Sequence, residues 1–110
     1  MIVEQRVYRL HTGKVPEYLR IYGEQGRAIQ EQILGRMVGW FTANEFGELN
    51  RVVHLWAYDD LDDRARRRAA LQADAGWQAV VAQLQTLIRE QESTILTPTP
   101  WSPIGGEQRS

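Results

Sequence analysis

Aromatic and polar side chains alternate with smaller apolar ones in three short segments, over residues 2–10, 35–43 and 50–58. Because successive side chains of a β-strand point to opposite faces, each alternating series lies on one face of its strand. Together the series give an aromatic–polar set of Glu4, Arg6, Tyr8, Trp40, His54, Trp56 and Tyr58. These residue types can transfer protons, bind anions and donate hydrogen bonds, which is the chemistry that the sequence offers.

Each ionisable member of this set has a chemical role and a structural alternative. His54 is the candidate catalytic residue, because an unperturbed imidazole exchanges its proton near neutral pH, although a strand histidine also serves in a core. Arg6 can bind a carboxylate or enolate oxygen through its fork of donors, but an ion pair with Glu4 is favoured because buried charges need partners. Tyr8 and Tyr58 can donate hydrogen bonds to an oxyanion, or can simply pack as rings.

Two interpretations of the aromatic–polar set stay open. In the first, the set forms a dimer interface with a hydrogen-bonded polar network, since interfaces are enriched in aromatic residues and arginine. In the second, it lines a pocket for a small organic molecule, and the number of ionisable groups beside the aromatics favours this view. The ligand-binding residues would then be Arg6, Tyr8, Trp40, His54, Trp56 and Tyr58.

Several classes of function find no support in the sequence. Cysteine is absent and the two histidines, His11 and His54, are far apart, so no metal site and no cofactor are expected. The net charge of −1 argues against nucleic-acid or membrane partners. No apolar run approaches the ~20 residues of a membrane span, and the first residues do not resemble a secretory signal, so a cytoplasmic protein is expected.

The elements that position these residues follow from periodicity and from turn residues. Strands are predicted over 2–10, 35–43, 50–58 and 91–97, and helices over 16–31, 59–74 and 77–88, with a break at 74–76. The order β-α-β-β-α-β is that of a ferredoxin-like α+β domain, in which an antiparallel sheet carries its helices on one face. The other face needs a cover, and the simplest cover is a second copy of the chain.

The remaining expectations concern parity, helix ends and the tail. Strand parity predicts an apolar set on the opposite sheet face, composed of Val3, Val7, Met37, Phe41, Val53 and Leu55.

Asp59 or Asp60 is expected to cap the second helical region, and the arginines at 64–68 to form a solvated, salt-bridged face with i,i+4 partners. The domain is expected to span 1–98, followed by an extended Pro-rich tail over 99–110. Trp101 in that tail is expected to dock on a neighbouring subunit, the alternatives being its own subunit or solvent.

Longer stretches of the chain resemble the NIPSNAP family, within the dimeric α/β-barrel superfamily. The resemblance covers residues 2–103 and rests on E-x-R-x-Y at 4–8, GKVPEYL at 13–19, LGRMVGWF at 34–41, LNRVVHLWAYDDLDDRARRRAAL at 49–71, WQAVV at 77–81 and ILTPTPWSP at 95–103. It implies that two ferredoxin-like protomers pair sheet to sheet in a homodimeric, eight-stranded barrel.

No activity follows from this resemblance, because the wider superfamily includes cofactor-free monooxygenases, haem-degrading enzymes, dehydratases and stress proteins. The sequence therefore leaves open whether the chain is an enzyme. The favoured hypothesis is a small-molecule-binding protein, extending to a cofactor-independent enzyme. The alternative is a non-catalytic dimeric adaptor or structural module.

Overall fold

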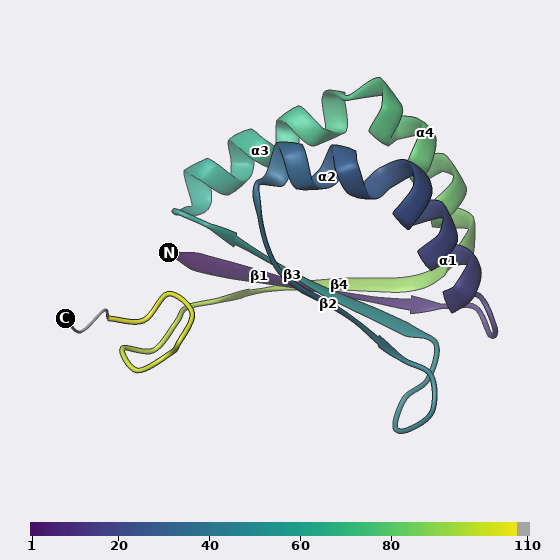
Figure 1. Ribbon diagram of the computed structural model, residues 1–110, viewed down its shortest axis with the longest axis horizontal. Coiled ribbons are helices and arrows are strands. Elements are labelled where there is room, and N and C mark those ends of the chain that lie inside the picture. Colours follow the sequence, from purple (N-terminus) through teal and green to yellow (C-terminus); the bar gives the residue numbers. More distant parts are fainter. Residues whose placement is uncertain (108–110) are drawn as a thin grey trace.

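A computed structural model describes residues 1–107 of the chain. Its centre is a four-stranded antiparallel sheet, and all of its helices cover one face of that sheet (Figure 1). The strands lie in the order β2-β3-β1-β4. Their bounds are Ile2–Leu10 for β1, Arg36–Ala43 for β2, Arg51–Tyr58 for β3 and Ile88–Leu96 for β4. The predicted ferredoxin-like α+β fold is confirmed, although the last strand begins three residues earlier than predicted.

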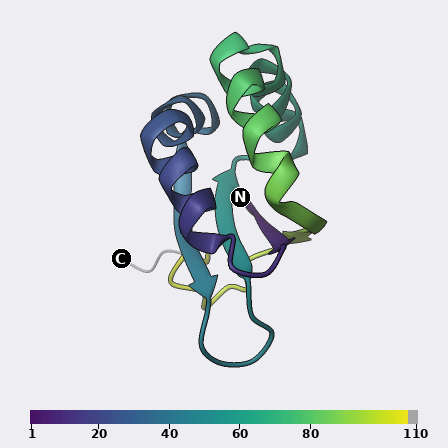
Figure 2. The same ribbon diagram turned by 90° about the vertical axis from the view of Figure 1, so that its right-hand side faces the viewer.

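Two helical connections lie side by side above the sheet (Figure 2). The first joins β1 to β2 and the second joins β3 to β4. Their parts are α1 (Val15–Ile21), the π-helical turn η1 (Tyr22–Gly26), α2 (Arg27–Leu34), α3 (Leu61–Ala73), α4 (Ala75–Leu84) and the 3₁₀ turn η2 (Gln85–Leu87).

The π-helical turn corrects the prediction of one regular helix over 16–31. The turn ends at Gly26, where helix α4 crosses close to the backbone. A Cβ atom at Gly26 would lie 3.0 Å from Val80 Cγ1 and 3.1 Å from Trp77 Cζ3. Glycine therefore eases the close approach of the two helices, and sequence periodicity cannot show such a tertiary constraint.

Aspartates divide the second connection as predicted. Asp60 caps α3, because its side chain accepts a hydrogen bond from Asp63 N at 2.7 Å. Asp74 ends α3 and caps α4 by accepting from Trp77 N at 2.9 Å, which confirms the predicted break. These caps mark α3 and α4 as separate segments.

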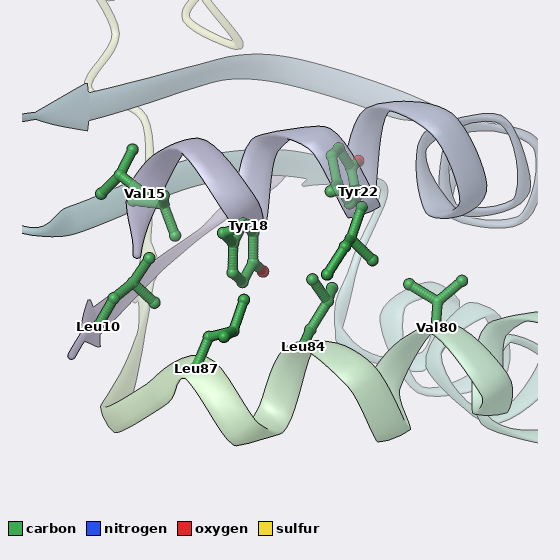
Figure 3. Close-up of a cluster of buried hydrophobic side chains, with 9 residues drawn as sticks. Leu10, Val15, Tyr18, Tyr22, Val80, Leu84 and Leu87 are labelled. Carbon is green, nitrogen blue, oxygen red and sulfur yellow. The ribbon is translucent and has the colours of Figure 1, made fainter. Parts of the chain in front are cut away.

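Two apolar clusters fill the space between the sheet and the helices. In the larger cluster, Val15, Tyr18 and Tyr22 extend from the first connection toward Val80, Leu84 and Leu87 of the second (Figure 3). The smaller cluster consists of Leu34, Trp56, Tyr58 and Leu71. Trp77 packs against both clusters and so joins them.

Strand register brings the aromatic–polar set onto one face of the sheet. Arg6 lies opposite His54, and His54 lies opposite Trp40. This face is covered by the helices of the same chain, so the set does not form an interface between sheets of two subunits. Met37 was expected on the opposite face and lies with Trp56 instead, because the register shifts between Met37 and Gly39.

The opposite face of the sheet carries no helix within residues 1–107. We call it the open face, and its apolar members on β1, β2 and β3 include Val3, Val7, Phe41, Val53, Leu55 and Ala57. Phe41 is 59% exposed and folds its ring over Gly39, where a Cβ atom would lie 2.7 Å from the ring. Gly39 thus lies next to the strand bulge and in close contact with the Phe41 ring.

The described part of the tail bends into turns instead of running extended throughout. Hydrogen bonds join Ser102 N to Thr99 O and Glu107 N to Pro100 O. Trp101 is 80% exposed, so it does not dock on its own subunit. Residues 108–110 of the predicted tail lie outside the described residues. Among residues 1–107, no helix combines the length and the apolar character that crossing a bilayer requires.

Candidate functional site

A cavity of about 200 Å³ lies between the aromatic–polar face of the sheet and the helices. Arg6 and Tyr8 of β1 and His54 of β3 contribute to its walls from the sheet side. The helical walls include Tyr18, Gln30, Arg68 and Trp77, and Gln91 of β4 lies at its edge. The cavity therefore combines aromatic rings with amides and two guanidinium groups.

Three of the six predicted ligand-binding residues line this cavity, namely Arg6, Tyr8 and His54. Trp56 and Tyr58 are fully buried in the smaller apolar cluster and do not line it. Burial and the negative charge of Glu4 raise the pKa of Tyr58 to about 12, so its hydroxyl stays protonated. Trp40 supports the site from behind, stacking on His54 with ring centroids 4.1 Å apart.

Glu4 pairs with Arg6 on the sheet side of the site but does not itself line the cavity, and its side chain is entirely inaccessible to solvent. Its Oε2 atom accepts from Arg6 Nη1 at 3.0 Å, Arg64 Nη2 at 2.8 Å and Ser93 Oγ at 2.5 Å. Burial alone would raise the pKa of Glu4, but these hydrogen bonds and the two arginine charges lower it to about 2. Glu4 is therefore an ionised structural partner, and the favoured Glu4–Arg6 ion pair is confirmed.

The Arg6 guanidinium donates hydrogen bonds to two neighbouring side chains. Besides its bond to Glu4, its Nε donates to the Tyr8 hydroxyl at 2.9 Å. Because the Tyr8 oxygen accepts this bond, its own proton is free to point elsewhere. Tyr8 can therefore donate a hydrogen bond into the cavity, as the sequence suggested.

His54 is 1% exposed and has one fixed hydrogen bond. Trp56 Nε1 donates to His54 Nδ1 at 2.7 Å, so Nδ1 is unprotonated and the neutral ring carries its proton on Nε2. Nε2 has no partner among the described residues. Burial, followed by the charges of Arg6 and Arg68, lowers the pKa of His54 to about 3. At neutral pH His54 is therefore a hydrogen-bond donor, and the expected role in proton transfer does not fit this geometry.

The arginines of α3 do not form one solvated face. Arg67 pairs with Asp63 at 2.9 Å, as predicted, but Arg64 reaches Glu4 instead of Asp60. Arg68 lines the cavity and makes no ion pair within residues 1–107. Burial and, after it, the charge of Arg6 lower the pKa of Arg68.

Sequence reasoning missed the helical half of the site. Arg64, Arg68 and Gln72 recur at steps of four, which is a polar stripe on the side of α3 that faces the sheet. That stripe was the available signal. Gln30 gave none, although it is 2% exposed and accepts a hydrogen bond from the Tyr22 hydroxyl at 2.5 Å. Among residues 1–107, no three His, Asp or Glu side chains cluster closely enough to hold a metal ion.

Comparison with known proteins confirms the family resemblance. The sequence model of the NIPSNAP family matches residues 3–103. Protein NipSnap of Drosophila melanogaster is 36% identical over 104 residues, which cover 93% of this chain and 36% of the fly protein. The chain thus spans about a third of the length of this relative and of its mouse and human counterparts.

Solved structures are similar to this chain at two levels, one of fold alone and one of family. At 16% identity, SnoaB of Streptomyces nogalater, a cofactor-independent oxygenase, covers 88% of this chain and 91% of its own with a TM-score of 0.57, a likeness of fold alone. A NIPSNAP family protein from Agrobacterium tumefaciens is 48% identical with a TM-score of 0.90, over 94% of this chain and 97% of its own. The family match extends over almost the whole chain and the solved relative superposes closely, so this chain belongs to the NIPSNAP family.

Proposed function

We propose that this chain binds a small organic molecule in the cavity between its sheet and its helices. The observation that carries the proposal is at His54, which lines the cavity and whose buried Nε2–H has no partner among the described residues. Buried polar atoms in folded proteins are nearly always paired, and leaving one unpaired costs about 1–3 kcal/mol. A ligand oxygen in the cavity would accept this hydrogen bond.

The size and lining of the cavity define what could fill it. An apolar cavity of about 150 Å³ holds benzene, and this one measures about 200 Å³. Tyr8, Tyr18 and Trp77 supply aromatic surface, which suits a flat or chain-like apolar body. The ligand expected is therefore a single-ring or short-chain compound with polar substituents.

The walls can stabilise negative charge, but they lack a general base. No Asp or Glu is present among the residues that line the cavity, and His54 is held neutral with Nδ1 occupied. A cofactor-independent reaction here would use the protein to hold a developing oxyanion with N–H and O–H donors. It would not use His54 to abstract a proton.

A variant that fills the cavity tests the proposal. Val81 lines the cavity from α4 and is half-buried, whereas Ala79 lies on the same helix, is exposed and does not line it. Native mass spectrometry of wild type should reveal a retained compound or, after addition of small aromatic compounds, a bound adduct. Val81→Phe should abolish this binding and Ala79→Phe should retain it. Binding that survives in Val81→Phe, or no binding by any compound, would favour the adaptor or structural-module alternative.

We also propose that the open face pairs with the open face of a second copy. Its centre is apolar, and Phe41 exposes 59% of its surface there. At the border, Arg9 forms ion pairs with Glu48 and Glu92, so charges of both signs are present there. Two identical faces can therefore complement one another. The family resemblance implies the same sheet-to-sheet barrel.

Light scattering after size-exclusion chromatography tests this pairing. Wild type should have the mass of a dimer, and Phe41→Asp should shift it to a folded monomer. Phe46→Asp is the matched control, because Phe46 is 85% exposed in the turn between β2 and β3. A wild-type monomer, or a Phe41→Asp dimer of unchanged stability, would contradict the pairing.

A further inference from the structure

We propose that the ligand of this cavity is an organic anion, whose carboxylate binds between the Arg68 guanidinium and the His54 Nε2–H. This inference rests on the proposed function and specifies the class of its ligand. It follows from the charges in and around the cavity, from their existing partners and from the donors that remain free.

The fixed charges near the cavity do not balance. Arg6, Arg64 and Arg68 are cationic, whereas Glu4 is the one carboxylate that pairs with any of them in residues 1–107. Glu4 Oε2 is shared by Arg6 and Arg64 and also accepts from Ser93. The negative charge of Glu4 is thus shared by Arg6 and Arg64, neither salt bridge of Glu4 involves Arg68, and the surroundings of Arg68 keep an excess of positive charge.

Arg68 is the guanidinium group that remains free to bind a ligand. It comes from α3, lines the cavity and has no ion pair in the described part of the chain. The Arg68 guanidinium is partly removed from solvent and is repelled by the positive charge of Arg6. A cation in such a place gains stability from an anion, and the planar guanidinium fits a carboxylate through two parallel hydrogen bonds.

His54 offers a second donor from the opposite wall. The bond from Trp56 Nε1 to Nδ1 fixes the Nε2–H tautomer, so this side chain can donate to a ligand but cannot accept from one through Nδ1. Arg6, Arg68 and His54 all line the same cavity, so the free donors of Arg68 and His54 face a common space. Acceptor atoms are what this arrangement recognises, and a carboxylate supplies two.

A matched pair of probes separates an anionic ligand from a neutral one. Benzoate and benzamide have the same ring and nearly the same shape, but benzoate alone is charged. Titrations followed by ¹H–¹⁵N NMR of wild type should give binding of benzoate at least about tenfold tighter than that of benzamide. The His54 Nε2–H signal should move with benzoate, because the carboxylate accepts its hydrogen bond.

Two arginine variants complete the test. Arg68→Gln should weaken benzoate binding by about tenfold or more while leaving benzamide binding nearly unchanged. Arg66→Gln is the control, because Arg66 is 71% exposed and lies two residues away on the same helix. Equal binding of the two probes, or benzoate binding unaffected by Arg68→Gln, would overturn the anion inference but keep a ligand cavity. If neither benzoate nor benzamide binds to the wild-type protein, the proposed function is overturned too.

Discussion

The buried histidine makes the stability of the protein depend on pH in a way that one substitution should remove. The pKa of His54 falls from 6.5 to about 3 on folding, first through burial and then through the charges of Arg6 and Arg68. Between these two values the unfolded chain binds a proton that the folded protein does not. Stability is therefore complete above pH 6.5 and is lost as the pH falls toward 3.

The size of this loss follows from the shift itself. One pH unit inside the window costs about 1.4 kcal/mol. Between about pH 7 and about pH 5 the single group should lower the free energy of unfolding by about 2 kcal/mol. Glu4 contributes little over this range, because its pKa is 4.5 in the unfolded chain and about 2 in the folded protein. Both values lie below about pH 5, so the carboxylate is mostly ionised in both states.

His54→Asn is the suitable variant, since the asparagine oxygen can still accept the hydrogen bond from Trp56 Nε1 and does not titrate. Urea unfolding at several pH values should show the loss of about 2 kcal/mol in wild type and a nearly flat profile in His54→Asn. The variant His11→Asn, altered at an exposed histidine, should keep the wild-type slope because His54 remains. Parallel profiles for wild type and His54→Asn would refute the assignment of a neutral, buried imidazole.

Other substitutions test the packing and the charges, with the free energy of unfolding from urea titration as the common measurement. Glu4→Gln should cost about 3 kcal/mol, because two arginines lose a buried partner, whereas Glu92→Gln on the exposed border should cost less than about 1 kcal/mol. Gly26→Ala should cost about 1–3 kcal/mol, because the added methyl group meets the side chains of α4. Gly23→Ala, with open space at the same π-helical turn, should be neutral or stabilising, and equal costs would contradict the close-approach argument. Asp74→Ala should cost about 1 kcal/mol through loss of the α4 cap, and an unchanged stability would show that the cap is dispensable.

Strand parity predicted most of the sheet correctly. The alternation in β1 and β3 grouped Arg6 with His54, and the observed register places them directly opposite one another. Parity failed at Met37, because a bulge next to Gly39 reverses the faces on either side of it. Such a bulge depends on pairing with β3, and the local sequence offers only a glycine as a hint.

The candidate site was only half predictable for a related reason. Residues on strands sort themselves by alternation, but the side of a helix that faces the sheet has to be inferred from its apolar residues. On α3 the side that faces the sheet includes Arg64 and Arg68. Because charged residues are expected on the solvent side of a helix, the sequence does not indicate that these two face inward. The tautomer of His54 could not be predicted either, since it depends on a neighbour two residues along the same strand, Trp56.

The alternation of β1 has a consequence for how this protein can diverge. Glu4 and Arg6 point toward the cavity side, while Val3 and Val7 lie on the open face. An insertion or deletion of one residue within β1 would exchange the two sides, placing valines beside the cavity and charges on the open face. Evolution can therefore vary the individual side chains of this strand far more freely than its length, and length changes are expected in the loops that flank it.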